Sequence, residues 1–334
     1  MIRLEILAFV LLVGLAGCRS EGISADESQA KPQVVATVGM LTDIVREVAG
    51  DRVELVGLMG PGIDPHLYKP TRHDVRRLAS ADLVFYVGLM LEGRMGDTLE
   101  RLQRSGRTIV AVGEALPEDQ IRFPSDFESH PDPHVWMDVG LWKRSVPVVA
   151  AALSELDPAG TATYQENAKR YGRQLEQLDT YIRETIATIP AGQRHLVTAH
   201  DAFGYFSRAY DIPVRSVRGI STESAAGLAD VRRLVDFLVE QRVPAIFIES
   251  SISPKNLRAV VAGARAEGAE VTIGGELYSD AMGAAGTYEG TYVGMMDHNA
   301  TTITRELGGD APEGGFRANA VTRSAPSHDV RTQR

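Results

Sequence analysis

The chain has 334 residues, 44% of them hydrophobic, a formal net charge of −9 at pH 7, and a single cysteine, Cys18. An acidic chain without runs of basic residues argues against nucleic-acid binding. One cysteine excludes an internal disulfide bond, and the length is sufficient for two domains.

Residues 1–17 have the features of a secretory signal peptide. Arg3 precedes a short apolar stretch, 6–15, whereas a membrane span needs roughly 20 apolar residues. The small residues before Cys18 resemble a bacterial lipobox, which implies cleavage before Cys18 and a diacylglycerol lipid on its sulfur. Residues 18–33 are polar and without apolar periodicity, so we expect a lipidated, flexible tether.

Residues 34–156 are expected to form an N-terminal α/β lobe, in which short apolar strands alternate with helices. One helix, 72–80, begins at a capping box made by Thr71 and Asp74. Such alternation predicts a mostly parallel sheet covered by helices. The strands are predicted at 34–38, 53–59, 82–88 and 108–112.

Residues 157–190 form a long polar segment in which apolar residues fall three or four positions apart. This spacing predicts a single linker helix of roughly 25–30 residues, bounded by Pro158 and Pro190. Its apolar positions are Tyr164, Ala168, Tyr171, Leu175, Leu178, Ile182 and Ile186.

Residues 191–307 repeat the alternation and are expected to form a C-terminal α/β lobe. Helices are predicted at 223–241 and from Ser253-Pro254 to Glu267. Strands are predicted at 195–199, 214–217, 245–249 and 270–274. Residues 308–334 show no periodicity, so we expect a disordered tail. The predicted fold is therefore α/β, with two lobes of parallel sheet bridged by one long helix.

Four residues of this predicted fold are candidates for binding a metal ion. His66, His200 and Asp280 each follow a predicted strand, where ligands of open α/β sheets are found. His134 lies in a rigid loop between Pro133 and Trp136. Three imidazoles and one carboxylate suit Zn²⁺ and, with a bidentate carboxylate, Mn²⁺. No local metal motif links the four positions, so this hypothesis depends on their placement at strand ends.

Enzymatic activity is not expected. The sequence contains no His-Glu-x-x-His helix, no Gly-x-Ser-x-Gly elbow and no phosphate-binding Gly-Lys loop. A catalytic zinc keeps an open position, whereas four protein ligands hold an ion without using it. The alternative, a metal-dependent hydrolase with Asp201 or Glu249 as base, requires an open coordination position. His130 lies in the same loop as His134, and the remaining histidines are read as structural or surface residues: His73, His195, His298 and His328.

Several stretches, in this order, resemble the solute-binding lipoproteins of zinc and manganese ABC importers. The resemblance covers almost the whole mature chain and is based on TVGMLTDIVREVAG (37–50), GIDPHLYKPTRHDVRRL (62–78), DPHVWMD (132–138), TAHDAFGYFSRAY (198–210), GISTESAAGLADV (219–231), AIFIESSISPKNL (245–257) and GGELYSDAMG (274–283).

The resemblance implies two α/β lobes bridged by one long rigid helix, the architecture of a helical-backbone metal receptor. It implies that His66, His134, His200 and Asp280 bind one divalent ion as cargo. The implied partners are a membrane permease and its ATPase. The implied location is outside the cytoplasm, lipid-anchored on the outer side of the cytoplasmic membrane or in the periplasm. We expect a monomer. A surface adhesin of the same fold is the alternative function.

The identity of the ion stays open between Mn²⁺ and Zn²⁺. The stretch 117–133 is short and acidic with a single His130, unlike the histidine-rich loop of zinc-dedicated relatives. Dedicated manganese relatives often have Glu where this chain has His200, and three imidazoles favour Zn²⁺ in intrinsic affinity. The sequences of 219–224 and 274–283, however, are most similar to those of relatives paired with manganese importers.

Overall fold

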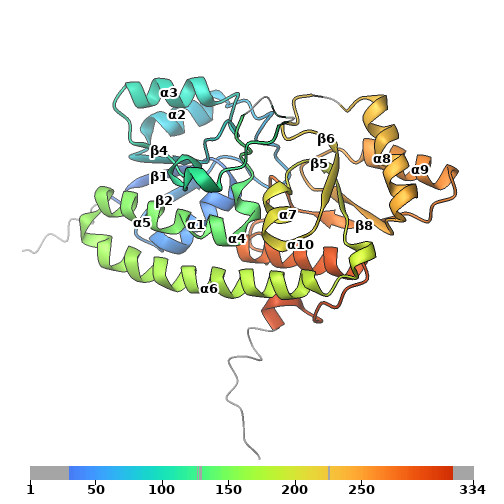
Figure 1. Cartoon of the computed structure of the whole chain (residues 1–334). Helices are drawn as coiled ribbons and strands as arrows, with labels where there is room; N and C mark the ends of the chain where they lie inside the picture. The colour runs from blue at the N-terminus through green and yellow to red at the C-terminus, as the bar shows by residue number, and fades with distance from the viewer. Residues whose placement is uncertain (1–29, 126, 128–129, 225, 319–334) are drawn as a thin grey trace, which may run out of the picture. The chain divides into compact units, whose positions relative to one another are not determined.

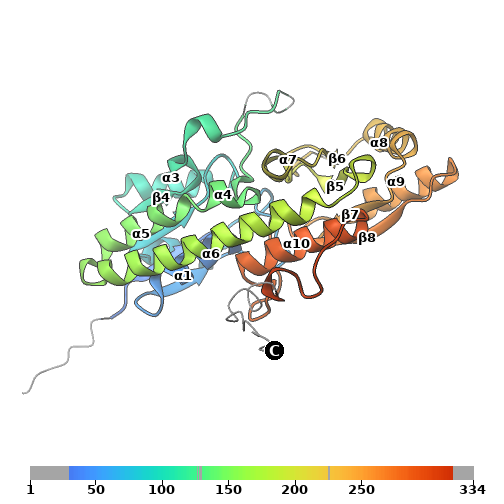
Figure 2. The same cartoon turned by 60° about the horizontal axis from the view of Figure 1, so that its bottom comes forward.

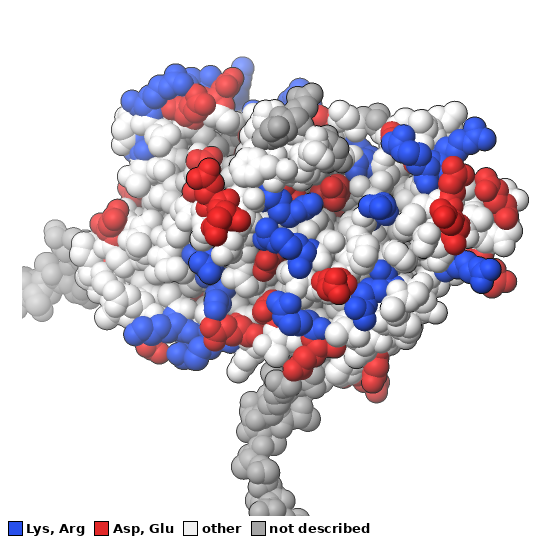
Figure 3. Space-filling model, viewed as in Figure 1, with Lys and Arg blue, Asp and Glu red and all other residues white. Residues whose placement is uncertain are grey.

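The structure is a computed structural model that describes residues 30–125, 127, 130–224 and 226–318. The predicted signal peptide, Cys18 and most of the predicted tether, and the last part of the predicted tail therefore lie outside the described residues. Among the described residues, no helix is both long and apolar enough to cross a bilayer. On the face shown in Figure 3, acidic and basic side chains are intermixed.

The N-terminal lobe is built on one four-stranded parallel sheet with strand order β2-β1-β3-β4. Its strands are β1 (Gln33–Ala36), β2 (Glu54–Gly57), β3 (Leu83–Tyr86) and β4 (Ile109–Ala111). Its helices are α1 (Gly39–Ala49), α2 (Arg72–Ser80), α3 (Gly96–Arg104), α4 (Val139–Trp142) and α5 (Ser145–Leu156), with short 3₁₀ turns at Gly113–Ala115, Glu118–Gln120 and Val135–Met137. The predicted α/β class is confirmed in this lobe.

Local chemistry explains where α2 begins. The Thr71 hydroxyl accepts the Asp74 amide hydrogen at 3.2 Å, and the Asp74 carboxylate accepts the Thr71 amide hydrogen at 2.7 Å. This reciprocal pair satisfies amide groups that the first turn of a helix leaves unpaired. The predicted helix 72–80 therefore has the observed bounds.

The C-terminal lobe contains two pairs of parallel strands. Strand β5 (Leu196–His200) pairs with β6 (Val214–Arg218), and β7 (Ala245–Glu249) pairs with β8 (Thr272–Leu277). Strands β5 and β7 are in contact but form separate sheets. At the end of β5, the Glu249 carboxylate accepts the amide hydrogens of Ala199 and His200. A side chain, and not a strand backbone, is the acceptor there.

The helices of this lobe are α7 (Gly204–Tyr210), α8 (Leu228–Gln241), α9 (Lys255–Ala266) and α10 (Tyr292–Glu306). The helix predicted at 223–241 begins later, at Leu228. The residue before it, Gly227, donates its amide hydrogen to the Asp230 side chain. Strand β8 extends past the predicted end at 274. The pairing of β7 with β8 shifts register between Ile246 and Phe247, so that Gly274 is accommodated as an extra residue within the strand.

Helix α6 (Thr161–Ala187) follows a 3₁₀ turn at Pro158–Gly160 and is followed by another at Ala191–Gln193. It contacts α1 and α5 of the N-terminal lobe and α7 and α10 of the C-terminal lobe, as Figures 1 and 2 show. Its buried face includes six of the seven predicted apolar positions, and Ala168 is half-buried. One hydrophobic cluster runs through both lobes along this helix, and a second lies among β5, β7, α8 and α9 of the C-terminal lobe.

The predicted disordered tail begins too early. Residues 308–318 are described and pack against the C-terminal lobe: Phe316 is buried, its ring lies 5.6 Å from that of Tyr181, and its amide donates to Asp297 at 2.8 Å. One aromatic ring and one buried carboxylate are sufficient to fix this segment, and neither produces a periodic pattern. Residues 319–334 lie outside the described part of the chain.

Replacement of a buried residue of α6 tests whether this helix stabilises the hydrophobic core that both lobes contribute to. Leu178 is fully buried, so Leu178→Ala should lower the free energy of unfolding by about 2–5 kcal/mol in urea denaturation of the metal-free protein. The neighbouring Gln177 is exposed, and Gln177→Ala should change the free energy of unfolding by less than about 0.5 kcal/mol. Equal urea midpoints for both variants and the parent would contradict this role.

Candidate metal centre

The structure brings His66, His134, His200 and Asp280 together between the two lobes. His66 lies in the loop after β2, His134 directly precedes the turn Val135–Met137, His200 ends β5, and Asp280 follows β8. All four side chains are buried, and one ligand atom from each lies within 4.8 Å of the others. The structure thus places the four candidate residues side by side, three of them after strands and His134 in a loop.

The distances in the cluster suit a metal ion. The Nε2 atoms of His66 and His134 are 3.3 Å apart. The Asp280 carboxylate lies 3.3 Å from His134 Nε2, 3.2 Å from His200 Nε2 and 3.8 Å from His66 Nε2. Zn²⁺ bonds of about 2.0–2.1 Å separate tetrahedral donors by roughly 3.3 Å. Three of these four separations are close to that value.

His134 is oriented by a carboxylate behind it. The Asp132 Oδ1 atom lies 2.8 Å from His134 Nδ1 and accepts the His134 amide hydrogen at 3.0 Å. Because a carboxylate accepts, Nδ1 is the donor in this contact. Arg122 forms an ion pair with the other oxygen of Asp132. The Nε2 atom is therefore directed toward the cluster, in the manner of carboxylate-supported metal-binding histidines.

Glu249 lies in the corresponding place behind His200 but makes no hydrogen bond of regular geometry with its ring. The Glu249 Oε2 atom lies 2.5 Å from His200 Nδ1, and Oε1 accepts the amide hydrogens of Ala199 and His200 at 2.7 and 2.9 Å. Sequence reasoning missed the supporting roles of Asp132 and Glu249, and treated Glu249 only as the base of an alternative hydrolase. The available signals were a carboxylate two residues before His134 and another at the end of β7.

Trp136 closes the cluster on one side and ties the two lobes together. Its ring centroid lies 5.3 Å from that of His134, and its indole nitrogen donates to the Ser279 carbonyl at 2.9 Å. The Tyr292 hydroxyl donates to the Trp136 carbonyl at 2.6 Å. These buried contacts hold the His134 turn against the loop that contains Asp280.

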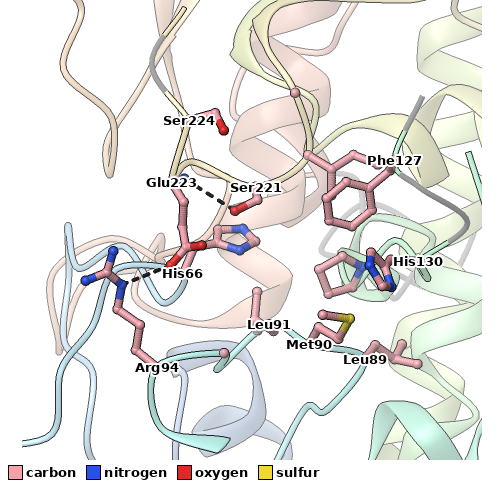
Figure 4. Close-up of a pocket in the computed structure, with 14 residues that line it drawn as sticks. His66, Leu89, Met90, Leu91, Arg94, Phe127, His130, Ser221, Glu223 and Ser224 are labelled. Carbon is pink, nitrogen blue, oxygen red and sulfur yellow. Dashed lines mark hydrogen bonds and ion pairs between the residues drawn. The ribbon is translucent and has the colours of Figure 1, made fainter.

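Asp280 lines a pocket of about 220 Å³, and His66 lines a second, larger pocket. The larger pocket has a volume of about 590 Å³ and is lined by residues of both lobes. Figure 4 shows the His66 ring in this pocket, with Arg94 and Glu223 on one side and Phe127 and His130 on the other. An ion entering from the larger pocket would meet His66 first.

The remaining described histidines are not part of the cluster. His73 is exposed on α2, His130 lines the larger pocket, His195 packs against Phe237, and His298 contacts the Glu276 carbonyl. His328 lies outside the described residues.

Burial and neighbouring charges shift the pKa values of the cluster. Burial lowers the pKa of His66 to about 3. Burial also disfavours a charge on His134, but hydrogen bonds to Asp132 and Asp280 outweigh it and raise the pKa of His134 to about 9. For His200, the charges of Glu249 and Asp280 overcome burial and raise its pKa well above the ordinary value. Burial would raise the pKa of Asp280, but His200 and His134 hold it well below its usual range.

Two parallel-sheet lobes, one long connecting helix, and a buried group of three imidazoles and one carboxylate are the features of a metal-binding solute receptor. The family model described as zinc-uptake complex component A, periplasmic (ZnuA), matches residues 34–306, and the chain belongs to this family.

Individual relatives agree with this assignment. The chain is 48% identical to the zinc-binding protein TroA of Treponema pallidum over 309 residues, which cover 92% of this chain and 99% of TroA. It is 45% identical to the manganese-binding lipoprotein MntA of Bacillus subtilis, over 91% of this chain and 99% of MntA. The solved structure of periplasmic TroA superimposes with a TM-score of 0.81 at 49% identity, covering 83% of this chain and 99% of TroA.

These comparisons confirm the predicted fold and function. The chain is an exported, metal-binding component of an ABC importer, works with a permease and its ATPase, and is not an enzyme. One metal ion is its cargo.

Metal affinity should rise with pH up to about 9. Below the pKa of His134, about 9, the metal-free protein holds a proton where an ion would bind, and binding must release it. Each released proton makes the affinity fall about tenfold per pH unit on acidification. Calorimetric titration with Zn²⁺ in buffers of different ionisation enthalpy should therefore show proton release at pH 7. The exposed-site variant His73→Ala should behave identically, and pH-independent binding between pH 7 and 9 would contradict the expectation.

Proposed function

We propose that His66, His134, His200 and Asp280 are the four protein ligands of the cargo ion, which is Zn²⁺ or Mn²⁺. The observation that supports this most directly is the burial of four ligand atoms within 4.8 Å of one another. Buried ionisable groups are stable only when paired or bound to a metal, and these four groups face one another in the interior.

The donor set accommodates either ion. Three imidazoles favour Zn²⁺ in intrinsic affinity, while Asp280 can bind through one or both oxygens and so extend the coordination number toward that of Mn²⁺. The relatives named above include a zinc-binding and a manganese-binding protein at similar identity. Competition between the two ions for the purified protein decides which is bound more tightly.

Delivery would follow docking of the receptor on the permease. In this proposal the lobes are 34–156 and 191–307, and the helix of 157–190 connects them. Helix α6 packs against helices of both lobes over its whole length, which supports small relative movements of the lobes and disfavours a wide hinge opening. A small displacement is sufficient, because ligands from both lobes must stay within bonding distance of one ion.

A lipid on Cys18 would keep the receptor close to the permease. In this proposal residues 1–17 are removed, residues 18–33 form the tether, and the receptor is a monomer on the outer side of the cytoplasmic membrane or in the periplasm. A single acyl chain binds membranes only marginally, so the two chains of a diacylglycerol thioether provide stable anchoring. The polar composition of 19–33 supports a flexible connection.

Removal of single ligands tests the metal site. Residues 19–334, purified without chelator, should contain one equivalent of Zn²⁺ or Mn²⁺. His66→Ala and Asp280→Ala should weaken binding by more than the roughly 10- to 100-fold typical of groups behind a ligand. The measurements are metal content by mass spectrometry and affinity by chelator competition.

The matched control is His73→Ala, because His73 is an exposed histidine of the same lobe. This variant should retain metal as the parent does. A parent without metal, or ligand variants that bind as tightly as the parent, would overturn the four-ligand assignment.

Replacement of Cys18 tests the anchor. In cells supplied with a labelled fatty acid, the parent should become labelled and Cys18→Ala should not, because the variant lacks the sulfur to which the lipid attaches. The purified variant should bind metal normally, since Cys18 precedes the folded region by more than ten residues. Label in the variant, or none in the parent, would contradict lipidation at Cys18.

A further inference from the structure

Residues 219–224, which we call the bridging segment, connect the C-terminal lobe to the loop that contains His66. The segment follows β6 and forms one wall of the larger pocket. Figure 4 shows its residues Ser221 and Glu223 beside the His66 ring and Ser224 farther from it. Thr222, in contrast, is buried, with only 1% of its surface exposed.

Arg218 fixes the shape of this segment from the end of β6. Its guanidinium donates to the Ser224 carbonyl at 2.9 and 3.1 Å and also to the Thr222 carbonyl. In the register of the two strands, Arg218 is the partner of His200. The bridging segment is therefore attached to the strand pair that positions one of the proposed ligands.

Thr222 reaches across to the other lobe. Its hydroxyl donates to Asp64 Oδ2 at 2.6 Å, and Asp64 Oδ1 accepts the His66 amide hydrogen at 2.9 Å. One carboxylate thus joins a threonine of the C-terminal lobe to the backbone of His66. Hydrogen bonds to an ionised group are stronger than those between neutral groups, and Thr222 is buried, so breaking this contact is unfavourable.

We infer that Thr222 is a positioning residue for metal retention: through Asp64 it holds the His66 loop in the place where His66 meets the ligands of the other lobe. The inference rests on the proposed function. His134 and His200 are supported by carboxylates at their own ring nitrogens, whereas this contact supports His66 through its backbone and from the opposite lobe. Loss of the Thr222 hydroxyl should therefore speed the release of the ion without removing a ligand.

The test compares two substitutions of Thr222 in the full-length protein, purified from membranes in mild detergent and loaded with Zn²⁺. Thr222→Val keeps the shape of the side chain but removes the hydroxyl, and should raise the rate of Zn²⁺ loss to a chelator by roughly 10- to 100-fold. Thr222→Ser restores the hydroxyl and should bring the rate back toward that of the parent. Co²⁺-loaded Thr222→Val should keep the absorption spectrum of the parent, because no ligand is lost.

The matched control is Glu223→Gln, which alters the same segment. Glu223 forms an exposed ion pair with Arg94 at 3.0 Å across the pocket, but it does not contact the His66 loop through Asp64. Exposed ion pairs contribute little, so this variant should change the release rate by less than about fivefold.

A double mutant shows whether the effect passes through Asp64. In an Asp64→Ala background, Thr222→Val should cause no further acceleration. The inference is overturned by an unchanged rate in Thr222→Val, by failure of Thr222→Ser to restore the rate, or by the same acceleration with and without Asp64. A parent protein that takes up no Zn²⁺ would instead contradict the proposed function.

Discussion

Burial of the Asp280 carboxylate is the constraint on which the metal centre depends. A buried charge is strongly unfavourable unless it is paired, and Asp280 is surrounded by the Nε2 atoms of three histidines. The imidazoles need support in turn, which Asp132 and Glu249 provide for His134 and His200. Arg122 then compensates the charge of Asp132. The loops at the strand ends thus have one charge-balanced arrangement, and a divalent cation among the four inner groups fits it.

The two lobes are connected by more than α6. Trp136 donates to the Ser279 carbonyl, Tyr292 donates to the Trp136 carbonyl, and the Asp43 carboxylate accepts from both Tyr171 and Tyr292. All of these contacts are buried, and they join α1, α6, α10 and the loops at the site. Movement of one lobe would therefore alter the positions of the proposed ligands directly.

Much of this arrangement could be predicted from the sequence, because periodic patterns and strand ends are local signals. The apolar spacing in 157–190 identified α6, and the Thr71–Asp74 pair identified the start of α2. The strand ends and the rigid loop of His134 identified the four candidate ligands. The separate strand pairs of the C-terminal lobe, the packing of Phe316, and the contacts of Asp132, Glu249 and Thr222 were not predicted. Each depends on a hydrogen bond or a ring contact between residues whose relation only the folded chain defines.

Glu249 has two tasks that cannot be separated. One of its oxygens contacts His200, and the other accepts two amide hydrogens at the end of β5. A shorter residue here would leave buried amide groups without an acceptor, and an uncharged residue would weaken the contact that orients the imidazole. Selection for a folded C-terminal lobe and selection for metal capture therefore act on the same side chain.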